Sequence, residues 1–148
     1  MSDKLKLHAR DAKDLEVLSA CLQDAIVPIS DMTFERAARR FVMVANRFCW
    51  ERADQTGDDA FDRVNCGVVF EGVSAVKLRR IDRGDRSLLL NLLAVTAEPQ
   101  PAGAAITLMC AGDRDIRLET DGIVCRLEDV DRPWPTRNRP AHRLDGPA

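Results

Sequence analysis

Cysteine and histidine are the residues of this chain with the most chemistry to offer, because they act as nucleophiles, bases and metal ligands. The two histidines, His8 and His142, lie near opposite ends of the sequence. The cysteines are widely spaced, and none of the intervals between them is typical of a zinc site. They are Cys21, Cys49, Cys66, Cys110 and Cys125. We therefore predict no metal site.

Phosphate-binding loops and tuned carboxylate pairs are also missing. Neither G-x-G-x-x-G nor G-x-x-x-x-G-K occurs, so no nucleotide cradle is indicated. Asp58, Asp59 and Asp62 cluster in a polar stretch, where solvation does not favour acid–base catalysis. We predict no catalytic residue and no cofactor, and the balance favours a protein that is not an enzyme. A sheet-lined pocket built from scattered residues stays open as an alternative.

Arginine forms two local groups, one in the polar segment 79–87 and one in the C-terminal segment 131–148. They are Arg79, Arg80, Arg83 and Arg86, and Arg132, Arg137, Arg139 and Arg143. Such groups can bind RNA, phosphate or an acidic partner protein. Asp82 and Asp85 stand within the first group, however, which is typical of a solvated turn. A net charge of −2 and 5% aromatic residues argue against nucleic acid as the main partner.

The segment 131–148 differs in composition from the rest of the chain, with four of the seven prolines. Proline at this density excludes a helix or a central strand, so we predict an extended or disordered Pro/Arg-rich tail. Trp134, held between two prolines, either folds back over the end of the sheet or anchors a partner. The candidate partner-binding residues are Trp134, Arg132, Arg137 and Arg139.

One stretch with helical spacing stands near the N-terminus. The apolar residues on one helical face are Leu15, Leu18, Leu22 and Ile26. Asp11 is placed to cap the first turn, and Pro28 lies just beyond the last. The spacing predicts an amphipathic helix over residues 12–26.

Residues 106–119, ITLMCAGDRDIRLE, alternate between apolar and polar side chains on both sides of a glycine-containing turn. This period of two is typical of strands. Pairing Cys110 with Ile116 keeps the apolar residues on one face. The same register sets Leu108 opposite Leu118 and requires a loop of three or five residues. We predict a β-hairpin.

Residues 123–130 can extend this hairpin. Asp121-Gly122 is a favoured type I′ turn, which would set Leu118 opposite Cys125 in a three-stranded meander. The apolar residues of 123–130 also fit helical spacing. We favour the strand over the helix.

Further strands are expected wherever apolar residues alternate. Residues 32–48 predict a second hairpin, and the other candidate strands are 5–7, 64–70, 76–78 and 88–95. These elements predict an α+β fold, with one N-terminal amphipathic helix packed on a mostly antiparallel, curled sheet or sandwich of about seven strands. Residues 1–130 would form a single globular α+β domain, and residues 131–148 the tail.

No apolar run approaches the roughly 18 residues of a membrane span, and the N-terminal residues lack the apolar core of a signal peptide. We expect a cytoplasmic protein without membrane contact. In a reducing compartment its cysteines would be free thiols, mostly serving as small buried side chains. Cys49, beside Trp50, is the cysteine least expected in the core.

Five segments together resemble a bacterial family of small proteins catalogued as a domain of unknown function. They are LQDAIV (22–27), RRFVMVANRFCWE (39–51), LLNLLAV (89–95), the hairpin at 106–119, and RPWPTRNRPAH (132–142). The resemblance covers nearly the whole chain and implies a stand-alone bacterial cytoplasmic protein. It supplies no catalytic residue, cofactor or substrate.

Our leading hypothesis is a non-catalytic protein-interaction or accessory module. It would meet an unknown partner protein, or another copy of itself, through an edge strand or the tail. The first alternative is a small-ligand-binding protein or enzyme with a sheet-lined pocket. The second is weak RNA or phosphate binding through the arginine groups.

Overall fold

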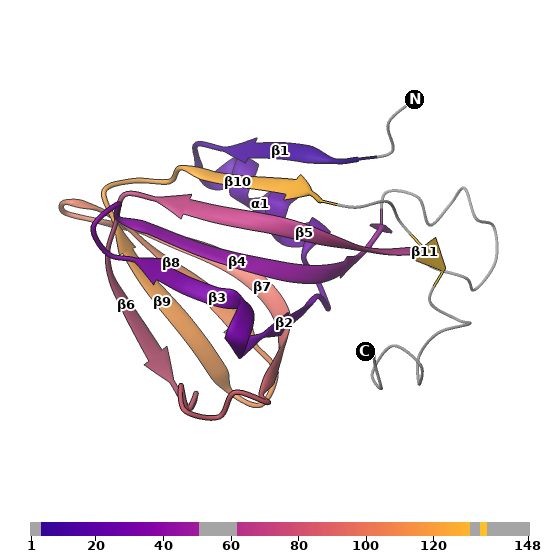
Figure 1. Cartoon of the computed structure of the whole chain (residues 1–148). Coiled ribbons are helices and arrows are strands. Elements are labelled where there is room, and N and C mark those ends of the chain that lie inside the picture. The colour runs from indigo at the N-terminus through magenta and orange to yellow at the C-terminus, as the bar shows by residue number, and fades with distance from the viewer. Residues whose placement is uncertain (1–3, 51–61, 131–133, 136–148) are drawn as a thin grey trace.

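The computed structural model describes residues 4–50, 62–130 and 134–135, and over these residues the protein is mainly β (Figure 1). Eleven strands form one antiparallel sheet, beside one α-helix and the short 3-10 helix η1 (Ile29–Asp31). The predicted α+β fold with about seven strands is therefore wrong. The helix is a minor element, and short strands lie at the end of the predicted helix and inside the predicted tail.

The strands range from two to twelve residues in length. They are β1 (Lys6–Ala9), β2 (Ile26–Pro28), β3 (Met32–Glu35), β4 (Arg40–Phe48), β5 (Asp62–Glu71), β6 (Val73–Arg79), β7 (Leu89–Gln100), β8 (Gly103–Cys110), β9 (Arg114–Thr120), β10 (Cys125–Asp129) and β11 (Trp134–Pro135).

The sheet is folded into two halves that enclose the core. β1, β10, β5 and β4 lie side by side in the first half, with β3 beside β4 and β11 beside β5. β7, β8, β9 and β6 form the second half, and the short β2 pairs with both β4 and β7. Figure 1 shows the halves as two layers that converge where β5 leads into β6. Alternate side chains of both halves point inward and are buried.

The α-helix, α1 (Ala12–Cys21), begins as predicted but ends before residue 26. The Asp11 carboxylate accepts a hydrogen bond from the Asp14 N–H at 2.8 Å, the cap that its position predicts. After the last helical turn the chain passes through Asp24, whose φ is +65°. The Asp24 N–H donates to the Leu92 carbonyl of β7 at 2.7 Å. The backbone is thereby drawn into the sheet, and Ile26 belongs to β2.

The hairpin predicted at 106–119 is present as β8 and β9, but its register differs by two residues. Leu108 lies opposite Ile116, where the sequence predicts Cys110. The loop has three residues and carries Gly112 at φ +82°, one of the two predicted lengths. A shift of two keeps the same side chains on the core face, so alternation alone does not detect it.

Residues 125–129 form β10, which confirms the strand over the helix. The predicted three-stranded meander is wrong, because β10 pairs with β5 and β1 and not with β9. A type I′ turn needs positive φ at both central residues, and neither Asp121 nor Gly122 has it. The chain instead crosses from the second half to the first, where Cys125 lies opposite Phe70.

A buried ion pair joins Arg47 of β4 to Asp129 of β10, the two strands that flank β5. Both side chains are fully buried. Arg47 Nε lies 3.0 Å from Asp129 Oδ1, and Arg47 Nη2 lies 2.9 Å from Asp129 Oδ2, a bidentate geometry. The Leu5 N–H donates to the same carboxylate at 2.9 Å, and the Leu5 carbonyl accepts a hydrogen bond from the Asp129 N–H. The pair thus ties the N-terminal segment, β4 and β10 together.

We expect Asp129→Asn to lower the free energy of unfolding by about 3–5 kcal/mol, because the buried Arg47 charge would lose the negative charge of the Asp129 carboxylate. Urea denaturation followed by circular dichroism measures the change. Glu128→Gln is the matched control, since the exposed Glu128 carboxylate lies 3.7 Å from Lys6 Nζ and such a pair contributes less than about 1 kcal/mol. Equal losses in the two variants would contradict the importance of the buried pair.

Gly103, at the start of β8, has no room for a side chain. Its φ is +152°, and a Cβ atom there would lie 2.1 Å from the Thr120 carbonyl oxygen. We expect Gly103→Ala to lower the free energy of unfolding by about 1–3 kcal/mol, measured by the same urea titration. Gly122→Ala should stay within about 0.5 kcal/mol, because no atom lies within 4 Å of the Cβ position at Gly122. A Gly103→Ala protein as stable as this control would show that the close approach is absent.

Candidate functional site

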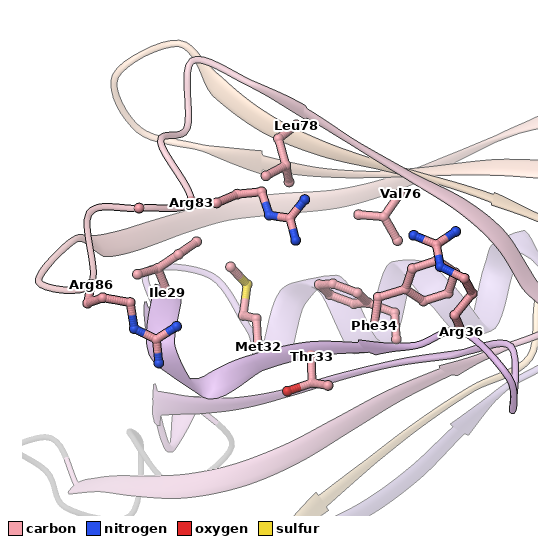
Figure 2. A pocket seen from close by; sticks show the side chains of 11 residues that line it. Ile29, Met32, Thr33, Phe34, Arg36, Val76, Leu78, Arg83 and Arg86 are labelled. Atoms are coloured by element: carbon pink, nitrogen blue, oxygen red, sulfur yellow. The ribbon is translucent and has the colours of Figure 1, made fainter.

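A groove opens between β3 of the first half and β6 of the second (Figure 2). Its volume is about 510 Å³, which lies within the range of natural ligand pockets. The lining residues are Ile29, Met32, Thr33, Phe34, Arg36, Phe41, Val76, Leu78, Arg83, Gly84 and Arg86. We call this site the β3–β6 groove.

Two backbone hydrogen bonds close the groove at its ends. The Val73 N–H at the start of β6 donates to the Arg39 carbonyl, in the turn after β3, at 2.9 Å. The Ile29 N–H of η1 donates to the Leu88 carbonyl, just before β7, at 3.0 Å. Between these contacts β3 and β6 diverge (Figure 1), and among the described strands β3 pairs only with β4 and β6 only with β9. The groove is therefore a gap in the sheet with a strand edge along each side.

The interior of the groove is apolar. β3 and β4 form the hairpin predicted from residues 32–48, and Met32 and Phe34 alternate along its first strand. Val76 and Leu78 alternate along β6, and Figure 2 shows these side chains pointing into the same space from the two walls. All four are only partly buried, although they pack against the core. Removing more of their apolar surface from water would be favourable, so the groove favours a ligand with an apolar part.

Three arginines rim this interior. Arg36 lies in the turn after β3, with its guanidinium carbon 5.0 Å from the centre of the Phe34 ring. Arg83 and Arg86 lie in the turn after β6, and Figure 2 shows the Arg83 guanidinium reaching over the groove. Within the described residues, none of the three side chains has a hydrogen bond or an ion pair. The rim is therefore a local positive charge that favours an anion.

The other two arginines of the predicted group are paired with Asp113, in the turn between β8 and β9, and with Asp115, in β9. Arg79 lies 3.0 Å from Asp113 and 2.7 Å from Asp115, and Arg80 lies 3.3 Å from Asp113. The hydrogen bond from Arg79 holds the pKa of Asp113 below its ordinary value. These two arginines are therefore largely neutralised by carboxylates.

The acidic residues of the turn after β6 bond their own backbone. Asp82 Oδ1 accepts from the Gly84 N–H at 2.9 Å, and Asp85 Oδ1 accepts from the Ser87 N–H at 3.2 Å. The four arginines of segment 79–87 thus divide into two that are paired and two that line the groove.

Sequence reasoning missed the groove because its walls come from separate parts of the chain. Arg36 lies within the hairpin predicted over residues 32–48, and no local pattern links it to Arg83. The available signal was the alternation of Met32 with Phe34 and of Val76 with Leu78, which marks two strands without saying that they face each other.

The predicted partner-binding residues are only partly within the described structure. Trp134 belongs to β11, where its backbone lies opposite Arg63 of β5. Its side chain lies outside the described residues, as do Arg132, Arg137 and Arg139. A partner contact through these four residues, and a domain boundary at residue 130, therefore stay predictions.

The cysteines are mostly core residues, as predicted. Cys66, Cys110 and Cys125 are buried, and burial raises the pKa of the Cys66 and Cys125 thiols to about 12 and that of Cys110 to about 11. Cys49 is also buried, but it is not part of the core cluster that contains Cys66, Cys110 and Cys125. Cys21 is partly exposed.

The described residues lack two further features. They contain no group of three or more His, Cys, Asp or Glu side chains placed to hold a metal ion. They also contain no helix of the length and apolarity needed to cross a membrane. His8 is exposed at the end of β1, and His142 lies outside the described residues.

We expect Cys66, Cys110 and Cys125 to resist alkylation in the native protein, because their thiols stay protonated and the thiolate is the reactive form. Iodoacetamide labelling at about pH 8 with and without concentrated urea, read by peptide mass spectrometry, tests this. Fast native labelling of Cys66 would contradict its burial.

The raised pKa values of the three thiols also predict how the free energy of unfolding depends on pH. Their contribution is fully present below about pH 8.5, where the thiols of the unfolded chain stay protonated, and it is lost as the pH rises further.

A family model matches nearly the whole chain. The match is to "Protein of unknown function (DUF2948)" and covers residues 5–142, which include every described strand and the β3–β6 groove. No match was found among curated proteins or among solved structures. The resemblance to a domain of unknown function is thereby confirmed. The chain belongs to the DUF2948 family of proteins of unknown function.

Proposed function

We propose that this protein is a non-catalytic binding module that takes a partly apolar anion in the β3–β6 groove. The observation that carries the proposal is the combination of an apolar interior with three arginine side chains that have no ion pair among the described residues. Neither feature alone would be informative, because exposed arginines and half-buried apolar residues are both common at protein surfaces.

Charge and shape support the same kind of ligand. Three guanidinium groups around one opening repel one another, and an anion between them relieves that repulsion. Met32 and Phe34 on one wall and Leu78 on the other offer apolar contact below the charged rim. A ligand with both an acidic group and an apolar group satisfies the rim and the interior together.

This proposal joins two of the hypotheses raised by the sequence. In this proposal the groove takes the role of the sheet-lined pocket of the ligand-binding alternative, and its open strand edges suit the interaction module. The thiols give no support to catalysis, since burial keeps Cys66, Cys110 and Cys125 protonated.

An anionic fluorophore tests the site. We expect 1-anilinonaphthalene-8-sulfonate to bind the native protein with one-to-one stoichiometry. The double variant Arg83→Gln/Arg86→Gln should raise its Kd about tenfold, which corresponds to about 1.4 kcal/mol. The physical reason is the loss of two cations from the rim, while the apolar interior is unchanged. Fluorescence titration below the unfolding transition measures the affinity.

Two controls make the result specific. N-phenyl-1-naphthylamine, which has the same rings without the sulfonate, should bind both proteins with similar Kd. Arg10→Gln removes an exposed arginine outside the groove and should leave both affinities unchanged. If Arg10→Gln weakens the sulfonate as much as the double variant does, the attraction is general and the groove is not the site.

A further inference from the structure

We propose that the occupant of the β3–β6 groove is an extended acidic segment of a partner protein, which adds as a strand between β3 and β6. This inference rests on the proposed function, because it identifies the ligand of the same site. It makes the groove a place where the sheet of this protein is completed by another chain.

The free edges of β3 and β6 favour a peptide as the ligand. Among the described strands, β3 and β6 each have a partner on one side only, so each presents a row of backbone N–H and C=O groups toward the gap. Such groups are templates for pairing with another strand. A peptide supplies matching donors and acceptors along its whole length, whereas a simple amphiphile such as a fatty acid supplies only the acceptors of its carboxylate.

The directions of β3 and β6 are compatible with an added strand between them. The turn after β3 contacts the start of β6 through Arg39 and Val73, whereas Ile29, before β3, contacts Leu88, after β6. β3 and β6 therefore run in opposite directions along the groove. A strand inserted between them would be antiparallel to one and parallel to the other, and sheets accept both pairings.

The spacing of the apolar side chains on the two walls matches that of an extended peptide. Met32 and Phe34 stand two positions apart on β3, and Val76 and Leu78 stand two positions apart on β6. A strand has the same period of two, so every second side chain of the added segment would face these residues. Those inward positions favour apolar residues, and the outward positions are unrestricted.

The arginines at the two ends of the groove favour acidic residues at both ends of the peptide. Arg36 follows β3 and so lies toward one end of the groove, while Arg83 and Arg86 follow β6 and lie toward the other (Figure 2). An added segment that carries an acidic residue before and after its apolar positions meets a guanidinium group at each end. Acidic residues at both ends of an alternating apolar core are therefore the expected signature of the partner segment.

A random peptide library tests the inference directly. The probe is a phage-displayed library of peptides of seven residues, the length of β6, panned against the full chain. We expect enriched sequences to alternate apolar residues and to carry Asp or Glu toward both ends. No enrichment, or enrichment of basic peptides, would overturn the inference.

N-methylation of the best peptide separates strand addition from side-chain binding. Methyl groups on alternate backbone nitrogens remove the donors of one edge and leave every side chain in place. We expect the Kd, measured by isothermal titration calorimetry, to rise at least about tenfold, and methylation of the other set of nitrogens to test the opposite edge. Two methylated copies that both bind as well as the parent would exclude strand addition.

The arginine variants link the peptide to the groove. Arg83→Gln/Arg86→Gln should weaken the acidic peptide about tenfold, and Arg10→Gln should leave its affinity unchanged. A peptide insensitive to the double variant binds elsewhere and overturns the inference. Sulfonate binding that depends on Arg83 and Arg86, with no peptide enriched, would leave the proposed function standing and reject only the peptide as ligand.

Discussion

The ion pair between Arg47 and Asp129 imposes a constraint that much of the sheet must satisfy. Two charges removed from water are tolerated only when their hydrogen bonds are made with good geometry, and here the partners come from β4, β10 and the N-terminal Leu5. A slip of β10 by one residue would turn Asp129 to the outer face and break both of its hydrogen bonds to the buried guanidinium. The pair therefore fixes the register of the first half of the sheet, within a core that consists mostly of apolar side chains.

The same sheet explains why a groove exists at all. β2 pairs with both β4 and β7 and joins the halves on one side, and the turn at Gly72 joins β5 to β6. η1 separates β2 from β3, and β3 pairs with no described strand of the second half. The two walls, β3 and β6, are joined at both ends of the groove by backbone hydrogen bonds. The core packing behind them sets the width of the space between. Apolar interior and charged rim then follow from strand alternation and from the arginines that the flanking turns carry.

Local patterns predicted the strands well and their neighbours poorly. The alternation of 106–110 with 116–119 identified a hairpin but not its register, because a shift of two leaves the same face buried. Asp121-Gly122 suggested a turn that the chain does not make, because a dipeptide preference of this kind is outweighed by the pairing of β10 with β5. The helix was cut short where the backbone of Asp24 bonds to β7, which is a tertiary contact. Arg47 and Asp129 each occupy an inward position in an alternating strand, yet only the strand order shows that they meet.

The pairing of β1 with β10 has a consequence for how the protein is made. Residues 6–9 lie opposite residues 125–128, so β1 has no strand to pair with until residues 125–128 have been synthesised. Long-range strand pairing of this kind slows folding. Until β10 has been synthesised, the edges of β1 and β5 that it will cover stay accessible to other molecules. The N-terminal segment carries Lys4 and Lys6, and lysines on an edge strand hinder its pairing with other chains.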